Sequence, residues 1–192
     1  MASISAAGTA IDAKLASLGH TLPPASVRPL RPAPRAAPHA RRPPHTAAHP
    51  APSRPAQKPV AAYVMATRIG NLIYTAGHLP VTPQGVVITG KVGSELTTEQ
   101  GYDAARAVGL NLLATLRSEL GGDLGRVRRV VKLTAFVNCV DSFAAQPKVV
   151  NGCSELMGEV FGEAGKHARS AVGVNALPLN VPVEIEAIVE VE

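Results

Sequence analysis

Hydrophobic and polar positions follow the period of β-strands in the first part of the folded region. Two short runs, Tyr63 to Ala66 and Asn71 to Ala76, flank a glycine-containing turn at residues 68–71 and predict a β-hairpin. A third strand is predicted from Gly85 to Thr89, because turn residues bound this apolar run on both sides. The folded region is therefore expected to begin with three strands.

The apolar spacing then changes to three or four residues, which is the period of a helix. One helix is predicted to start at Thr98 and to end at Gly121-Gly122. A second helix is predicted from about Ala144 or Pro147 to Phe161. Near the N-terminus, a shorter apolar face predicts a small helix that braces the main domain; its residues are Ala10, Ile11, Leu15 and Leu18.

Three further strands are predicted at Val127 to Asn138, Ser170 to Val174 and Val183 to Val191. In the last of them, apolar residues alternate with glutamates such as Glu184, so one sheet face packs against the helices and the other is polar. Val130 and Phe136 are predicted to lie on this polar face. A face that mixes polar and apolar residues is typical of a surface that another subunit partly covers.

The predicted order of elements is β-β-β-α-β-α-β-β, which indicates an α+β sandwich with a mixed sheet and both helices on one face. The chain of 192 residues is long enough for one compact domain of this kind. The three predicted segments are an N-terminal helical brace (1–22), a disordered insertion (23–59) and the folded domain (60–192).

The predicted insertion contains most of the positive charge. Its 37 residues include twelve prolines, seven basic residues and no acid, and frequent proline disfavours regular structure. The insertion carries +7 and the whole chain +5, so the other 155 residues carry −2. The folded domain is therefore not predicted to bind nucleic acid. Two interpretations of the insertion remain: a basic arm for RNA, an anionic surface or a proline-binding module, or a segment without defined contacts.

The sequence also bears on the cellular compartment of the protein and on whether it binds a metal. No apolar run approaches the roughly 18 residues of a membrane helix, and the start of the chain lacks the pattern of a secretory signal. We expect a soluble cytoplasmic protein without a membrane partner, with an organelle as the alternative compartment. Cys139 and Cys153 are too few for a disulfide framework or a thiolate metal site. His78 and His167 lack partners at suitable spacing, so we expect them at the surface or a cleft rim and predict no metal.

Two motifs of the folded domain resemble the signatures of a known family. The stretch GNLIYTAGHLP at Gly70 to Pro80 resembles the N-terminal signature of the reactive-intermediate deaminase family, also called RidA or YjgF and formerly endoribonuclease L-PSP. Its C-terminal signature resembles ARSAV at Ala168 to Val172, then Leu177-Pro178, then VEIEAI at Val183 to Ile188. The similarity covers about Val60 to Glu192, and a helix before such a domain resembles a longer, bacterial-type branch of the family.

This resemblance implies a chorismate-mutase-like fold, a homotrimer and a ligand cleft at each subunit interface. The implied activity is hydrolysis of 2-imino or 2-enamino acids, such as 2-iminopropanoate and 2-iminobutanoate, to the 2-keto acid and ammonia, without cofactor or metal. It also implies that Arg169 and Glu184 are catalytic, and that Arg169, Gly77, Tyr63 and Asn151 bind the substrate.

An imino acid has a carboxylate beside the C=N carbon, so its enzyme needs a bidentate cation and a way to direct water. The guanidinium of Arg169 suits the first task and the carboxylate of Glu184 the second, while Gly77 lets a ligand approach its carbonyl. The residues alone also allow structural roles: an ion pair for Arg169, a solvated face for Glu184 and a strand end for Gly77. Ala76 and Ala171 replace a hydroxyl residue and a cysteine that are frequent in the family, so the substrate range stays open.

Two other classes of function are retained, an endoribonuclease or RNA-binding protein and a non-catalytic trimer that binds small carboxylates. RNA cleavage usually requires two acid–base groups near a phosphate.

One geometric condition applies to the deaminase. If the last two strands form a hairpin, Arg169 lies opposite about Ile188, roughly 13 Å from Glu184. The two catalytic residues then meet only across an interface or through a different strand pairing.

Overall fold

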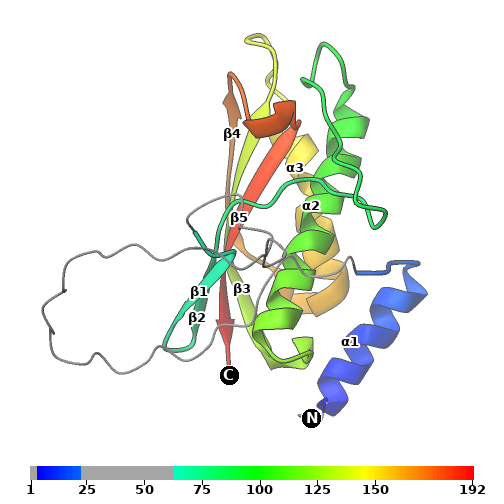
Figure 1. The fold of residues 1–192 in the computed structure, drawn as a ribbon, viewed down its shortest axis with the longest axis vertical. Helices are drawn as coiled ribbons and strands as arrows, with labels where there is room; N and C mark the ends of the chain where they lie inside the picture. The colour runs from blue at the N-terminus through cyan, green and yellow to red at the C-terminus, as the bar shows by residue number, and fades with distance from the viewer. Residues whose placement is uncertain (1–3, 23–62) are drawn as a thin grey trace, which may run out of the picture.

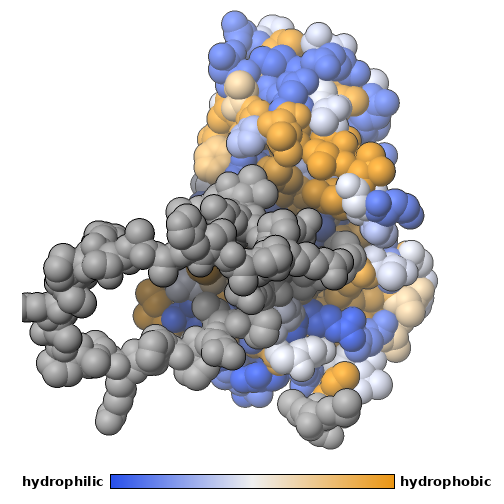
Figure 2. All heavy atoms as spheres, viewed as in Figure 1, coloured by the Kyte–Doolittle hydropathy of each residue, from blue (hydrophilic) through white to orange (hydrophobic). Residues whose placement is uncertain are grey.

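The computed structural model describes residues 4–22 and 63–192 (Figure 1 and Figure 2). The insertion predicted at residues 23–59 lies outside the described residues. None of the described helices combines the length and the apolar character that crossing a membrane requires. The described elements are α1 (Ala6–Ser17), β1 (Ala66–Ile69), β2 (Leu72–Thr75), α2 (Thr98–Glu119), η1 (Leu124–Arg126), β3 (Val127–Asn138), α3 (Gln146–Phe161), η2 (Gly162–Gly165), β4 (Ala168–Val174), η3 (Pro178–Asn180) and β5 (Val183–Val191).

The five strands form one mixed sheet in the order β1-β2-β5-β3-β4. Strands β3 and β4 are parallel, and the other neighbouring strands are antiparallel. The two long helices, α2 and α3, lie on the same side of the sheet (Figure 1). The other face, which none of the helices in the described part covers, is called the open face below. The structure confirms the predicted α+β fold, with both long helices on one side of a mixed sheet.

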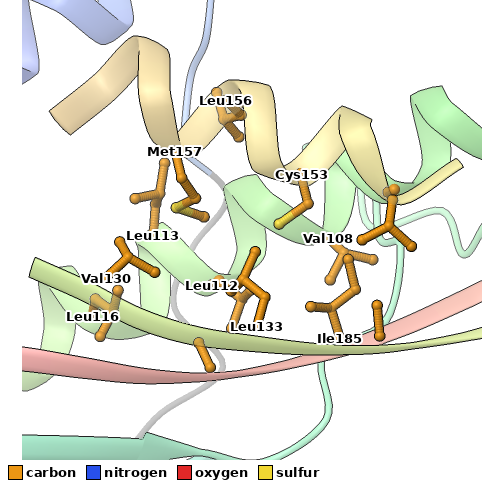
Figure 3. Close-up of a cluster of buried hydrophobic side chains, with 14 of the residues drawn as sticks. Val108, Leu112, Leu113, Leu116, Val130, Leu133, Cys153, Leu156, Met157 and Ile185 are labelled. Atoms are coloured by element: carbon orange, nitrogen blue, oxygen red, sulfur yellow. The ribbon is translucent and has the colours of Figure 1, made fainter. Parts of the chain in front are cut away.

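The hydrophobic core lies between the two long helices and the sheet (Figure 3). Leu112 of α2, Leu156 of α3 and Leu133 of β3 are completely buried there. The helices can approach closely because Gly109 of α2 faces α3, where a Cβ would lie only 2.8 Å from Leu156 Cδ2. Burial of each such leucine stabilises the fold by about 2 kcal/mol. The core fixes the position of α3 and of β3, the strand that lies between β4 and β5.

Polar side chains define where two of the helices begin. α2 starts with a capping box, in which Thr97 Oγ1 accepts from the backbone N–H of Gln100 (3.2 Å) and Gln100 Oε1 accepts from that of Thr97 (2.8 Å). The start of α1 is held by Asp123, which accepts a hydrogen bond from the backbone N–H of Ser5 (2.9 Å). Leu15 of α1 is buried in the core. The N-terminal helix is thus packed against the domain.

The first predicted strand is displaced along the chain. β1 spans Ala66–Ile69 and not Tyr63 to Ala66, although the hairpin with β2 is present as expected. The tight turn is made by Gly70 and Asn71, and Gly70 has a positive φ of 60°. The register of the hairpin follows from this turn, and it leaves Tyr63 before the start of the sheet.

The strand predicted at residues 85–89 is wrong. In the described chain this segment has a single bridge, between Val81 and Val87, and Val86 is 61% exposed. Gly85 turns the chain with a φ of 81°, so the apolar run forms a loop instead of joining the sheet. The observed order is therefore β-β-α-β-α-β-β.

The prediction that Val130 lies on the polar face of the sheet is wrong. The register with β5 shifts twice, between Val127 and Arg129 and again between Val130 and Lys132. Such bulges change which side chains face the core. Val130 is consequently buried in the core and Val131 points outward, while Phe136 stays half-buried on the open face as predicted.

Candidate functional site

Arg169 lies on β4, on the side of the sheet that faces α3. Its Nη1 donates hydrogen bonds to Oδ1 of Asn151 and to Oγ of Ser154, both at 2.9 Å, and its Nη2 donates to the carbonyl oxygen of Pro147 at 3.3 Å. The three acceptors follow one another at helical spacing on α3, so they form one stripe along the helix. All three are neutral, and within residues 4–22 and 63–192 no acidic side chain forms an ion pair with Arg169. The structural ion pair considered for Arg169 is therefore not formed in the described chain.

The outer edge of this guanidinium remains available. Within the described residues, Nε of Arg169 has no hydrogen-bond acceptor, and the side chain is half-buried. The Nε–H together with one N–H of Nη2 presents two parallel donors, which match the two oxygens of a carboxylate. The residue is thus oriented from one side and open to a small anion on the other.

Ser154 connects Arg169 to His167. Its Oγ lies 3.0 Å from Nε2 of His167, and Nδ1 of that imidazole lies 2.6 Å from the carbonyl oxygen of Gly165. Because a carbonyl only accepts, Nδ1 carries the proton, and Nε2 of the neutral ring accepts from the Ser154 hydroxyl. Burial lowers the pKa of His167, and the charge of Arg169 lowers it further, which favours this neutral form. Ser154 therefore accepts from the arginine while donating to the histidine.

Sequence reasoning missed Ser154 and the bond that joins it to His167. The available signal was the spacing on α3, because Ser154 follows Asn151 by three residues and shares its face of the helix. His167 immediately precedes β4 but is linked to α3 only through the folded structure. His167 is half-buried, which agrees with the predicted position at the surface or a cleft rim.

Glu184 lies on β5, and its carboxylate is in contact with Gly77. Its neighbours Val183 and Ile185 are completely buried in the core, so Glu184 points to the open face of the sheet. A Cβ at position 77 would overlap with the Glu184 carboxylate, so the arrangement requires glycine. The backbone next to Gly77 is held by a bridge between His78 and Ile185.

The pair formed by Glu184 and Gly77 offers two acceptors of different kinds. Burial raises the pKa of the Glu184 carboxyl, and the neighbouring charge of Glu186 raises it further. A raised pKa makes the carboxylate a stronger base at neutral pH. The carbonyl oxygen of Gly77 accepts no hydrogen bond from the described residues, so it too is free for a ligand.

Arg169 and Glu184 lie on opposite sides of the same sheet. The hairpin considered for the last two strands is absent, because β3 lies between them: Arg169 pairs with Leu133, and Glu184 pairs with Phe136. The two residues are thus offset by three positions, about 10 Å along the strands, and by two strands, about 10 Å across them. They cannot reach one small molecule within a single chain. The structure therefore separates the candidate residues into two groups, called half-sites below: Arg169 with Asn151 and Ser154, and Glu184 with Gly77.

Tyr63 belongs to neither half-site in the described chain. It precedes β1, its side chain is 63% exposed, and it makes no side-chain hydrogen bond to a described residue of either group. Its predicted role in substrate binding remains a prediction.

His78 lies in the core and not at the surface or at a cleft rim. It is 3% exposed; its Nε2 lies 2.8 Å from Oγ1 of Thr115, and its Nδ1 lies 2.9 Å from the carbonyl oxygen of Ala76. Burial lowers the pKa of this imidazole. With both nitrogens bonded, His78 anchors the segment behind Gly77. The described residues contain no group of three or more His, Cys, Asp or Glu side chains placed to hold a metal ion.

The fold and sequence have counterparts among known proteins. The model of the endoribonuclease L-PSP family matches residues 53–191, and the chain belongs to this family. This match confirms the resemblance drawn from the two sequence motifs.

Individual relatives support the same assignment. Protein TCP17 of Trypanosoma cruzi is 45% identical over 136 residues, which are 70% of this chain and 84% of that protein. The 2-iminobutanoate/2-iminopropanoate deaminase of Dermatophagoides farinae is 30% identical over 138 residues, 71% of this chain and 91% of the relative. The crystal structure of Atu1372 from Agrobacterium tumefaciens, a protein of unknown function, is 36% identical with a TM-score of 0.75, covering 97% of this chain and 96% of the other. That similarity extends over nearly the whole of both chains.

Proposed function

We propose that this protein hydrolyses 2-imino acids to 2-keto acids and ammonia in clefts between copies of the chain. The proposal rests on the guanidinium of Arg169, which three neutral acceptors of α3 orient and which keeps its charge and its Nε–H free. Such a group suits the carboxylate that lies beside the C=N carbon of an imino acid. The deaminase of Dermatophagoides farinae, a relative along 71% of this chain, supports the same reaction.

Each cleft would combine Arg169 and Asn151 of one copy with Glu184 and Gly77 of the next, because the two half-sites of one chain face away from each other. Three copies in a closed ring would form the homotrimer that the family resemblance implies, with three equal clefts. Tyr63 would line the cleft from the second copy.

The open face of the sheet suits contact with further copies. Val172 is 45% exposed, and a hollow of about 110 Å³ on this face is lined by residues that include Tyr74, Lys132 and Glu186. Exposed apolar surface of this kind is typical of an interface.

In the proposed reaction, Arg169 holds the substrate carboxylate and the carbonyl of Gly77 accepts the N–H of the imine. Glu184 takes a proton from a water molecule, whose oxygen attacks the C=N carbon and gives a carbinolamine. Glu184 returns this proton to the nitrogen as the carbinolamine forms, and it then transfers the proton of the new hydroxyl group to the same nitrogen. The C–N bond breaks as the C=O bond forms, and ammonia leaves. The balance is one imino acid and one water to one keto acid and one ammonia, and it needs no oxidant, reductant or cofactor.

The description of the family as endoribonuclease L-PSP gives a second candidate function. The described site suits it less, because RNA cleavage usually uses a pair of acid–base groups beside a phosphate. His78 is buried, and both nitrogens of His167 are already bonded. Glu184 therefore has no histidine partner in the described chain.

A direct test generates 2-iminopropanoate in situ with an amino-acid oxidase and follows its loss by trapping with semicarbazide. The wild type should accelerate the loss, and Arg169→Ala should lower kcat/KM about 100-fold, because two hydrogen bonds to a charged group are lost. Absence of acceleration by the wild type, with the keto acid still bound, would identify a non-catalytic carboxylate-binding protein. Cleavage of RNA by the wild type, abolished in Glu184→Ala, would favour the second candidate.

Complementation tests whether the clefts lie between copies. Arg169→Ala and Glu184→Ala are each expected to be inactive alone. When the two are co-expressed, about one cleft in four combines an intact Arg169 with an intact Glu184, so about a quarter of the wild-type activity should return. A mixed assembly that stays inactive would show that the two residues do not share a cleft across an interface.

A further inference from the structure

A cleft of about 270 Å³ lies at the end of the seam between β4 and the start of α3. Its lining includes Phe143, Gln146, Gly173 and Asn175. Gly173 lies on the same face of β4 as Arg169, four residues further along, which corresponds to about 13 Å. The cleft and the arginine therefore lie on the same side of β4.

The arginine side chain covers part of the distance to this cleft. Its guanidinium donates to the carbonyl oxygen of Pro147, and Pro147 directly follows Gln146, whose side chain lines the cleft. Between Arg169 and Gly173, the side chain on the same face of β4 is only Ala171. A molecule whose carboxylate binds Arg169 can thus extend along the seam past a small residue.

The absence of a side chain at Gly173 leaves room for two residues of the cleft lining, Gln146 and Cys139. A Cβ at this position would lie 2.9 Å from Nε2 of Gln146 and 3.0 Å from Sγ of Cys139, which is closer than normal packing allows. A larger residue would therefore fill the space between β4 and the first turn of α3.

The polar groups of the cleft are mainly acceptors. Both N–H bonds of the Gln146 amide are directed to Phe143 O (2.7 Å) and Cys139 Sγ (3.8 Å), which leaves Oε1 of Gln146 without a donor in the described chain. The Asn175 side chain has no hydrogen-bond partner there either.

The charges around the cleft offset one another. The carboxylate of Asp141 lines it, and the ammonium of Lys91 lies nearby, donating to the backbone carbonyl of Asn175 at 2.7 Å. A cleft of this composition suits an uncharged group that donates hydrogen bonds, and it gives no advantage to an anionic or a purely apolar group.

We infer that this cleft receives the side chain of the imino acid, and that the preferred substrates are 2-imino acids whose side chain ends in an uncharged hydrogen-bond donor, such as a carboxamide. The inference rests on the proposed function, since it places the substrate carboxylate at Arg169. It adds a second recognition point beyond the Pro147 carbonyl to which the guanidinium donates, formed by Gln146, Gly173 and Asn175. The volume of the cleft exceeds what the methyl group of 2-iminopropanoate would fill.

The test measures kcat/KM of the wild-type protein for three imines, which are generated in situ from glutamine, methionine and alanine. Glutamine and methionine have side chains of similar length, so their ratio isolates the terminal amide. One added hydrogen bond should make kcat/KM about three- to tenfold higher for the glutamine-derived imine than for the methionine-derived one. In Gly173→Val, the ratio of glutamine-derived to alanine-derived activity should fall at least tenfold, because the cleft is filled. In Asn175→Ala, the preference for glutamine over methionine should shrink towards one.

The outcomes separate this inference from the function on which it rests. A glutamine-to-methionine ratio near one in the wild type, or a Gly173→Val variant that slows all three imines equally, overturns the inference while leaving imine hydrolysis intact. If Arg169→Ala keeps the full activity of the wild type, the proposed function itself is overturned. Circular dichroism and thermal unfolding verify that the Gly173→Val variant is folded. The wild-type glutamine-to-methionine ratio and the Asn175→Ala variant test the inference independently of this variant.

Discussion

The carboxylate of Glu184 occupies the space that a side chain at Gly77 would need. Gly77→Ala must therefore displace either the loop after β2 or the carboxylate itself. Because catalysis is sensitive to displacements of about 1 Å, we expect kcat for imine hydrolysis to fall about 10- to 100-fold. The measurement is the initial rate with 2-iminopropanoate at saturation.

Gly158→Ala provides a matched control for this substitution. Gly158 lies on α3, and a Cβ there meets no atom within 4 Å. Alanine should leave activity unchanged and stabilise the helix by about 0.5–1 kcal/mol. If Gly77→Ala behaves like Gly158→Ala, the close contact with Glu184 has no part in the reaction.

The raised pKa of Glu184 predicts a pH dependence of the proposed reaction. Burial is the main cause of the shift and the charge of Glu186 the second. A general base acts in its ionised form, so activity should rise with pH through this raised pKa. Glu186→Gln removes the neighbouring charge and should move the acidic limb of the kcat/KM profile to lower pH.

Glu190→Gln is the control for the pH profile. Glu190 lies on the same face of β5, but about 20 Å further along the strand, so its charge should be largely screened at Glu184. The profile should remain that of the wild type. An acidic limb that does not move in Glu186→Gln would mean that a group other than Glu184 sets it.

Local pattern predicted the elements better than it predicted their pairing. The capped, strongly periodic helix α2 and the alternating strand β5 have the extents that the sequence indicated. The bulges that turn Val130 inward depend on the register between β3 and β5, which is a long-range property of the sheet. The loop at residues 85–89 has the composition of a strand but no neighbouring strand to pair with in the described chain.

For the candidate site, too, the sequence identified individual residues but not how the fold groups them. The motifs drew attention to Arg169 and Glu184, but only the strand order shows that β3 separates them and that they face opposite sides. The contact between Ser154 and His167 joins a helix to the start of a strand, and no spacing in the sequence signals it. Residue types were therefore readable in advance, whereas their grouping into two half-sites required the fold.

Ser154 shares its hydroxyl between Arg169 and His167, which predicts a specific effect of its removal. Ser154→Ala deletes one of the acceptors that orient the guanidinium. We expect KM for the imino acid to rise about five- to tenfold with a smaller change in kcat, because the carboxylate clamp is weakened before the chemical step. Ser154→Thr keeps the hydroxyl and should restore most of the affinity. Equal loss in both variants would instead indicate a general effect on packing of α3.

The buried imidazole of His78 should make the free energy of unfolding depend on pH. Burial lowers its pKa in the folded protein below the value of about 6.5 expected for the unfolded chain. The unfolded chain therefore binds the proton first, so stability falls as pH decreases from about 6.5 towards the lowered folded-state pKa. The loss is at most about 1.4 kcal/mol per pH unit for one histidine.

His78→Gln isolates this contribution. An amide keeps a donor and an acceptor for Thr115 and the Ala76 carbonyl but does not titrate. Urea unfolding at pH 7.5 and 5.5, at equal protein concentration, should show a smaller loss of stability in the variant than in the wild type. The dependence that remains would come from His20 and His167, since burial also lowers the pKa of each. An identical pH dependence in both proteins would mean that His78 takes up its proton without leaving the core.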